Sequence, residues 1–192
     1  MVSIRKILQA LYYLQSKSDC KDKYGKIYLL KLIYFADRYH LRHFGFVPSG
    51  DTYKAMEYGP VASATYDILK RKPPFNVNSC EYNLIDFVEE KNENEVEIKQ
   101  QEQDELSKSY IKSLDFALKN YGKLDGFELS KITHLYPEWK KHEETLKSGV
   151  LQVTMDFVDF FDNPKDKDLE EDPFKDDDKF LKLMREDYIE NN

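Results

Sequence analysis

The sequence predicts a mainly α fold with a small β-hairpin or sheet, an α+β class in which a compact helical domain carries an acidic C-terminal extension. Three observations predict this. Apolar residues recur every three or four positions in several segments, one segment alternates with period two, and acidic residues gather near the C-terminus. We place the helical domain at residues 1–154 and the extension, which ends in an amphipathic helix, at residues 155–192.

Five segments of the domain have the apolar spacing of helices that bury one face. They cover about residues 4–14, 26–44, 61–69, 106–121 and 127–135. Gly45 stands where a glycine commonly ends a helix, and Pro137 closes the last segment. In the extension, further helices are expected at residues 155–161 and in a stretch with one apolar face made by Phe180, Leu181, Met184 and Tyr188.

A Gly-Pro step, Gly59 and Pro60, precedes the third helical segment. Glycine adopts backbone angles closed to other residues, and the fixed φ of proline suits the first turn of a helix. We therefore expect a junction with close backbone approach at Gly59 and a helix that begins at Pro60.

Residues 77–100 alternate with period two around the polar sequence KNENE. Ile85 and Phe87 stand before this tip, and Val96 and Ile98 follow it. Such a pattern predicts a β-hairpin.

The formal net charge of −7 is concentrated in the extension, which holds fourteen Asp or Glu against six Lys or Arg and leaves residues 1–154 at +1. The linker at residues 162–179 has the composition of a poorly ordered, solvated segment. This balance argues against nucleic-acid binding, because a phosphate backbone requires a basic surface. Two interpretations stay open: the tail only keeps the protein in solution, or it occupies a basic surface of a partner.

The N-terminal segment predicts an amphipathic helix and no signal sequence, because Gln9 interrupts its apolar run. The apolar run at residues 27–36 contains Lys31 and is too short to span a bilayer. We expect a cytoplasmic protein without membrane contact, in which Cys20 and Cys80 are reduced structural thiols.

Catalytic and metal sites are weakly indicated. His40 and His43 are three residues apart on a helix, but a third ligand at suitable spacing is missing, and a surface or capping pair is favoured. The sequence contains no Walker loop, GxGxxG, GxSxG or HExxH. We assign no catalytic residue, metal or cofactor, and keep as the minority hypothesis an enzyme that uses His134 or the His40 and His43 pair with a metal.

Three stretches resemble a known family: KLIYFADRYHLRHFG at 31–45, KAMEYGPVASATYDILK at 54–70 and LSKITHLYPEWK at 129–140. Together they resemble the Panacea antitoxin domain, also described as SocA-like or phage-associated GepA-type. Met56, Glu57 and Tyr58 stand where that family commonly has Trp or a similar residue before the GPV element. The residues that match its motifs are Lys31, Leu32, Tyr34, Phe35, Tyr58, Gly59, Pro60, Val61, Tyr66, Leu129, Ser130, Thr133, His134 and Trp139.

The resemblance implies a helical, non-catalytic antitoxin that binds a cognate toxin encoded by an adjacent gene, in a prophage or phage-defence setting. Two alternatives are a protease adaptor that delivers the toxin to a cellular protease, and an acidic nucleic-acid mimic. Partner binding is expected at exposed aromatic and Arg anchors and along the last helix, namely at Arg38, Tyr39, Arg42, Tyr58, Phe180, Met184 and Tyr188.

Overall fold

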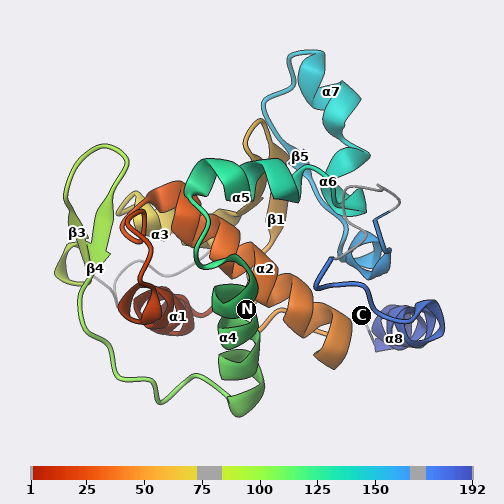
Figure 1. Cartoon of the computed structure of the whole chain (residues 1–192), viewed down its shortest axis with the longest axis horizontal. Helices are drawn as coiled ribbons and strands as arrows, with labels where there is room; N and C mark the ends of the chain where they lie inside the picture. The colour runs from red at the N-terminus through yellow and green to blue at the C-terminus, as the bar shows by residue number, and fades with distance from the viewer. Residues whose placement is uncertain (1, 73–83, 165–171, 192) are drawn as a thin grey trace.

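The computed structural model describes residues 2–72, 84–164 and 172–191, which form eight α-helices and two antiparallel sheets. The long helix α2 (Lys26–Phe44) runs through the middle of the molecule. Helices α1 (Ile4–Lys17), α4 (Lys108–Tyr121), α5 (Gly126–Thr133) and α8 (Asp178–Asn191) pack around it (Figure 1). The predicted α+β class, mainly helical with a small sheet, is confirmed.

Helix α2 is buried along most of its length because neighbours cover it on several sides. Its apolar residues Leu29, Leu32 and Phe35 are fully buried in the core. The ring of Phe35 stacks on that of Tyr121 from α4, with 3.8 Å between the ring centroids. As expected, Gly45 ends the helix in the left-handed conformation, with φ of 80°.

Serine side chains start the two helices that flank α2. The side chain of Ser3 accepts a hydrogen bond from Lys6 N at the start of α1, and that of Ser107 accepts one from Tyr110 N at the start of α4. Each serine satisfies a backbone donor that the helix itself cannot satisfy.

A three-stranded sheet in the order β2-β1-β5 lies beside α2. Strand β1 (Tyr53–Met56) pairs antiparallel with β2 (Gly59–Ala62) and with β5 (Val153–Thr154). The prediction that a helix begins at Pro60 is wrong, because Pro60 lies within β2 and α3 (Ser63–Leu69) starts three residues later. Proline fits here since β2 is an edge strand, where a missing N–H costs no ladder bond on the open side.

The predicted β-hairpin is confirmed as β3 (Val88–Glu90) and β4 (Val96–Ile98). Its first strand starts later than expected, because Leu84–Asp86 form a 3₁₀ turn and Phe87 precedes the strand. The side chain of Gln15 in α1 fixes the hairpin: its amide donates to Val96 O at 3.0 Å, and its oxygen accepts from Ile98 N at 2.8 Å.

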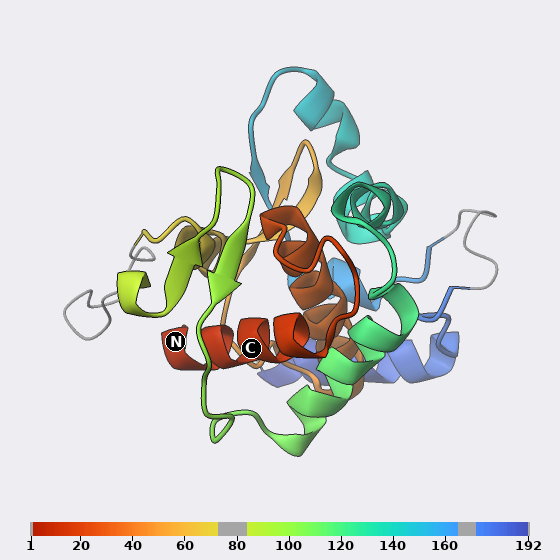
Figure 2. The same ribbon diagram turned by 60° about the vertical axis from the view of Figure 1, so that its left-hand side comes forward.

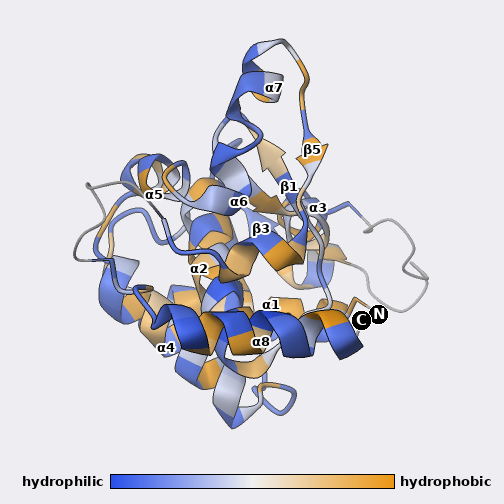
Figure 3. Cartoon of the chain, turned by 90° about the vertical axis from the view of Figure 1, so that its right-hand side faces the viewer, coloured by the Kyte–Doolittle hydropathy of each residue, from blue (hydrophilic) through white to orange (hydrophobic). Residues whose placement is uncertain are grey.

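Short helices connect the body to the C-terminal part: α6 (Pro137–Lys140) and α7 (Glu143–Lys147) follow α5, which ends earlier than expected. The helix expected at residues 155–161 is the 3₁₀ helix η2 (Phe157–Phe161). The terminal amphipathic helix is present as α8, which lies across one side of the molecule (Figure 3). Among the helices of the described residues, none combines the length and apolar character that a membrane crossing requires.

The described residues of the acidic linker are not fully solvated, although the sequence predicted a solvated segment: Asp177, Asp178 and Lys179 are exposed, but other residues are buried. Phe174 is buried in the core, and Phe160 and Phe161 are buried just before the linker. Residues 165–171 and Cys80 lie outside the described residues, while Cys20 is a half-buried free thiol. A boundary between two units at residue 154 stays a prediction.

Candidate partner-binding site

The motif residues from α2, β2 and α5 meet around the buried ammonium group of Lys31. Lys31 Nζ donates to Pro60 O at 2.9 Å, and burial lowers the Lys31 pKa to about 7. Gly59 has φ of +98°, and a Cβ atom there would lie 2.4 Å from Thr133 Oγ1 and 2.8 Å from Lys31 Nζ. The close backbone approach expected at Gly59 is confirmed, since only glycine fits between these two side chains.

His134 lies at the edge of this cluster, stacked on Trp139 with 3.8 Å between the ring centroids. Burial and the nearby charge of Lys31 lower the His134 pKa to about 4, so the imidazole is neutral at neutral pH. Its Nε2 has no hydrogen-bond partner among the described residues. The ring thus packs on Trp139, whose Nε1 donates to Met56 O.

Side chains from α5 and α6 hold the turn between β1 and β2. Trp139 Nε1 donates to Met56 O at 2.9 Å, and Ser130 Oγ donates to Tyr58 O at 2.7 Å. The Tyr58 side chain is 53% exposed above this fixed turn. Phe127, one helical turn before Ser130, is 64% exposed. The buried motif therefore supports a rigid turn that presents an aromatic ring to the outside.

Arg38 is not an exposed anchor, contrary to the expectation from the sequence. Its side chain is fully buried, with Nε donating to Glu138 Oε1 at 2.7 Å and Nη2 donating to Asp162 O at 3.1 Å. Tyr34 OH donates to the same Glu138 oxygen at 2.6 Å. Burial alone lowers the Arg38 pKa, but the carboxylate of Glu138 outweighs it and raises the pKa. Arg38 is thus one half of a buried ion pair.

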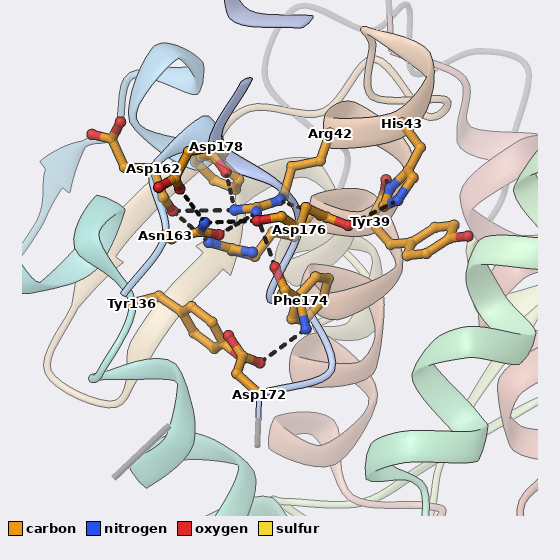
Figure 4. Close-up of polar contacts among 12 residues, drawn as sticks. Tyr39, Arg42, His43, Tyr136, Asp162, Asn163, Asp172, Phe174, Asp176 and Asp178 are labelled. Carbon is orange, nitrogen blue, oxygen red and sulfur yellow. Dashed lines mark hydrogen bonds and ion pairs between the residues drawn. The ribbon is translucent and has the colours of Figure 1, made fainter. Parts of the chain in front are cut away.

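Arg42 is also buried rather than exposed, because residues 160–163 and 174–176 surround its guanidinium (Figure 4). Nη1 donates to the carbonyl oxygens of Phe160 and Asp162, both at 3.1 Å. Nη2 donates to Asn163 Oδ1 at 2.6 Å and to Phe174 O at 2.9 Å. Burial lowers the Arg42 pKa to about 10, so the group is charged at neutral pH. Arg42 holds the C-terminal part on the body and has no free donor for a partner.

The aromatic residues near the end of α2 are engaged within the protein. Tyr39 is half-buried and stacks on His43 and on Phe116, with centroids 4.1 Å and 4.3 Å apart. His40 is buried, so the expected surface pair is wrong for this residue; its Nδ1 bonds Phe46 O at 2.9 Å. His43, the other member of that pair, is partly exposed. No group of three or more metal-ligating side chains occurs in residues 2–72, 84–164 and 172–191.

On α8, the predicted anchors face the body to different degrees. Leu181 is buried, and Met184 and Tyr188 are half-buried against the core, where the Tyr188 ring lies 5.6 Å from that of Phe161. Phe180 is partly exposed beside His43. Met184 and Tyr188 therefore pack α8 against the core, and Phe180 is the predicted anchor on α8 whose side chain is exposed.

The other motif residues form the core between these features. Tyr66 is half-buried, with Lys70 Nζ 4.0 Å from its ring centroid. The remaining residues are buried, namely Leu32, Tyr34, Phe35, Val61 and Leu129.

Sequence reasoning missed Asp37, Glu138 and Phe127. Asp37 is fully buried and accepts from Tyr53 OH at 2.8 Å, and burial raises its pKa to about 7. An acidic residue inside the apolar run KLIYFADRYH was a usable signal for a buried polar group. Nothing in the local sequence marks Glu138 as the partner of a residue one hundred positions away.

The fold and the site define a helical domain in which the buried motif residues support the β1–β2 turn, and this turn exposes the aromatic ring of Tyr58. The antitoxin SocA-like, Panacea domain family matches residues 29–140, which is more than half of the chain. The chain therefore belongs to this family, and the resemblance found in its motifs is confirmed. No curated protein and no solved structure matches the chain.

Proposed function

We propose that this protein is a non-enzymatic antitoxin that neutralises a cognate toxin by binding it directly in the cytoplasm. Membership of the antitoxin SocA-like family carries the proposal. The buried polar residues of the motif support it, because Lys31 and Trp139 donate hydrogen bonds to the backbone on either side of the β1–β2 turn and Thr133 packs against Gly59.

We assign the toxin-binding surface to the end of the molecule where the β1–β2 turn projects (Figure 2). Tyr58 on this turn and Phe127 on α5 are exposed aromatic residues, and Ser130 of α5 joins the two elements through its hydrogen bond to Tyr58 O. Aromatic side chains on a rigid base lose little conformational entropy on binding and are common energetic centres of interfaces. Phe180 on α8 is a second candidate anchor on another side.

The decisive experiment is to express the adjacent gene alone and together with this chain, and to purify the pair through a tag on one protein. The proposal expects growth arrest by the neighbour alone, growth with the pair, and a complex that co-purifies. A harmless neighbour, or toxicity that this chain leaves unchanged, would contradict it.

The amount of toxin in the rescued cells separates direct neutralisation from protease delivery. Direct neutralisation leaves the toxin present in a complex, whereas an adaptor lowers its level unless the protease is removed. The nucleic-acid mimic is disfavoured, because acidic residues of the C-terminal part pair with the protein's own cations: Asp176 with Arg42, Asp159 with Lys141 and Asp162 with Arg185.

A further inference from the structure

Phe174, from the C-terminal part, fills an aromatic socket on the helical body. The socket consists of Phe35 on α2, Phe116 and Tyr121 on α4, and Tyr136 before α6. The Phe174 ring is 1% exposed, and its centroid lies 4.9 to 6.1 Å from those of the four socket residues. The Phe174 side chain, from a segment distant in sequence, therefore completes a cluster whose other members belong to α2, α4 and the start of α6.

Asp176, two positions after Phe174, is bound by the side chains of Arg42 and His43. Arg42 Nη2 donates to Phe174 O at 2.9 Å, and Arg42 Nε donates to Asp176 Oδ2 at 3.1 Å. His43 Nε2 lies 3.4 Å from Asp176 Oδ1. Burial raises the Asp176 pKa, but the hydrogen bonds and charges of His43 and Arg42 outweigh it and hold the pKa below its ordinary value.

The residue two positions before Phe174 is also recognised. Tyr136 OH donates to Asp172 Oδ1 at 2.7 Å, and the same oxygen accepts from Phe174 N at 3.1 Å (Figure 4). The socket, together with Arg42 and His43, thus contacts a short pattern at three positions: an acidic residue, a phenylalanine and a second acidic residue, each separated by one residue.

The segment does not satisfy all polar groups around it. Arg38 Nη1, Glu138 Oε2 and Asp172 Oδ2 are buried without a hydrogen-bond partner among the described residues. The Arg38 guanidinium lies 4.7 Å from the Phe174 ring centroid, so these groups border the occupied socket. Buried polar atoms without partners weaken the state that contains them. With residues 172–176 in place, polar groups beside the socket therefore remain without hydrogen-bond partners among the described residues.

The socket and its occupant also differ in their relation to the family. The aromatic socket, Arg42 and His43 all lie within residues 29–140, the stretch that the family matches, whereas residues 172–176 lie outside it. The recognising groups belong to the family domain, and the recognised segment belongs to the extension of this chain.

We propose that the aromatic socket, together with Arg42 and His43, is a peptide-binding site for a partner protein segment of the pattern acidic–x–Phe–x–acidic, which residues 172–176 occupy in the free protein. The carboxylate after the ring complements Arg42 and His43, and the carboxylate before it accepts a hydrogen bond from Tyr136 OH, which argues for a partner with an acidic residue on each side of its Phe. The inference goes beyond the proposed function, because it does not require the partner to be a toxin.

The test uses the full chain with Phe174→Ala and a fluorescent synthetic peptide that covers residues 170–178. We expect the peptide to bind the variant at least tenfold more tightly than it binds the wild type, where the socket is filled. A peptide that carries the Phe174→Ala change should bind the variant at least tenfold more weakly than the native peptide. A peptide with Asp176→Asn should bind more weakly and with a smaller dependence on salt.

Equal binding of the native and alanine peptides, or no binding to a folded variant, would overturn the proposal. Should Phe174→Ala prevent folding, Phe174→Leu keeps an apolar side chain in the socket but loses the ring contacts. The native peptide should then bind this second variant more tightly than the wild type, and equal affinities would overturn the proposal. Wild-type dimers that disappear on Phe174→Leu would show instead that the segment exchanges between two copies of this chain. That result would also overturn the proposal of a separate partner protein.

Discussion

Lys31 and Pro60 are joined by a 2.9 Å hydrogen bond that links the middle of α2 to an edge strand inside the protein. Lys31 is 1% exposed, and burial lowers its pKa from 10.5 to about 7 because the charged form is disfavoured there. Between pH 7 and pH 10.5 the folded protein therefore binds fewer protons at this group than the unfolded chain does. The free energy of unfolding should rise with pH across this window through Lys31.

Replacing Lys31 by Met should remove this rise. Urea unfolding at pH 7 and pH 9.5 should give the wild type a gain from Lys31 of up to about 3 kcal/mol that the variant lacks, since each unit of pKa shift corresponds to about 1.4 kcal/mol. Lys182→Met is the matched control, because that side chain is 76% exposed on α8. A pH dependence that is the same in wild type and Lys31→Met would contradict the assignment.

Asp37 should have the opposite pH dependence. Burial raises its pKa from 3.8 to about 7, while the hydrogen bond from Tyr53 OH acts in the other direction. Between pH 3.8 and pH 7 the folded protein binds more protons at Asp37 than the unfolded chain does, so the free energy of unfolding falls as the pH rises through that window, and the full penalty persists above it.

Asp37→Asn should consequently stabilise the protein at pH 7.5 by about 1–3 kcal/mol, because Asn keeps an acceptor for Tyr53 without a buried charge. At pH 4.5 the gain should be much smaller. Chemical denaturation at both pH values measures this, with Asp19→Asn as an exposed control. A variant that is destabilised equally at both pH values would show that Asp37 is needed for packing rather than tolerated as a buried acid.

Gly59→Ala should destabilise the protein for two separable reasons. The positive φ of 98° costs an L-residue about 1–2 kcal/mol, and the new Cβ atom would meet Thr133 Oγ1 and Lys31 Nζ. Gly149→Ala is a matched control, since Gly149 has φ of +100° and no atom within 4 Å of an added Cβ. We expect the Gly59 variant to lose about 1–3 kcal/mol more than the Gly149 variant, from overpacking alone. Equal losses of stability for the Gly59 and Gly149 variants in thermal unfolding would contradict a packing contribution at Gly59.

Local patterns predicted most of the helices and the hairpin, because apolar periodicity reports which face of an element is buried. The exposure of Arg38 and Arg42 was mispredicted for a physical reason. Both lie on the polar side of α2, which periodicity assigns to solvent, but the residues that cover them are distant in sequence: Glu138 for Arg38, and Asp176 for Arg42. Such pairs cannot be read from spacing within one helix.

The Gly-Pro step was mispredicted for a different reason. The φ of proline suits both a first helical turn and an edge strand, so Pro60 by itself did not decide between them. The deciding contacts are made by β1, which pairs Ala55 with Pro60 and Met56 with Gly59. The role of Gly59, in contrast, depends on its own lack of a side chain and was predictable from the sequence.

Tyr58→Ser tests the proposed toxin-binding surface. The ring is 53% exposed and its turn is fixed through the backbone oxygen of Tyr58, so the free energy of unfolding should change by less than about 0.5 kcal/mol. If the ring is an energetic centre of the interface, the affinity for the co-purified toxin should fall by about 10- to 100-fold, which corresponds to about 1.4–2.8 kcal/mol.

Phe46→Ser is the matched control for this change, because Phe46 is an aromatic residue of nearly the same exposure, 54%, in the loop after α2 rather than on the β1–β2 turn. Titration of the toxin with each purified variant should show a loss for Tyr58→Ser and wild-type affinity for Phe46→Ser. Phe180→Ser, measured in the same way, reports on the α8 side. Wild-type affinity for Tyr58→Ser together with a loss for Phe180→Ser would move the interface from the β1–β2 turn to α8, because both rings are exposed and only the one buried by the partner contributes binding energy.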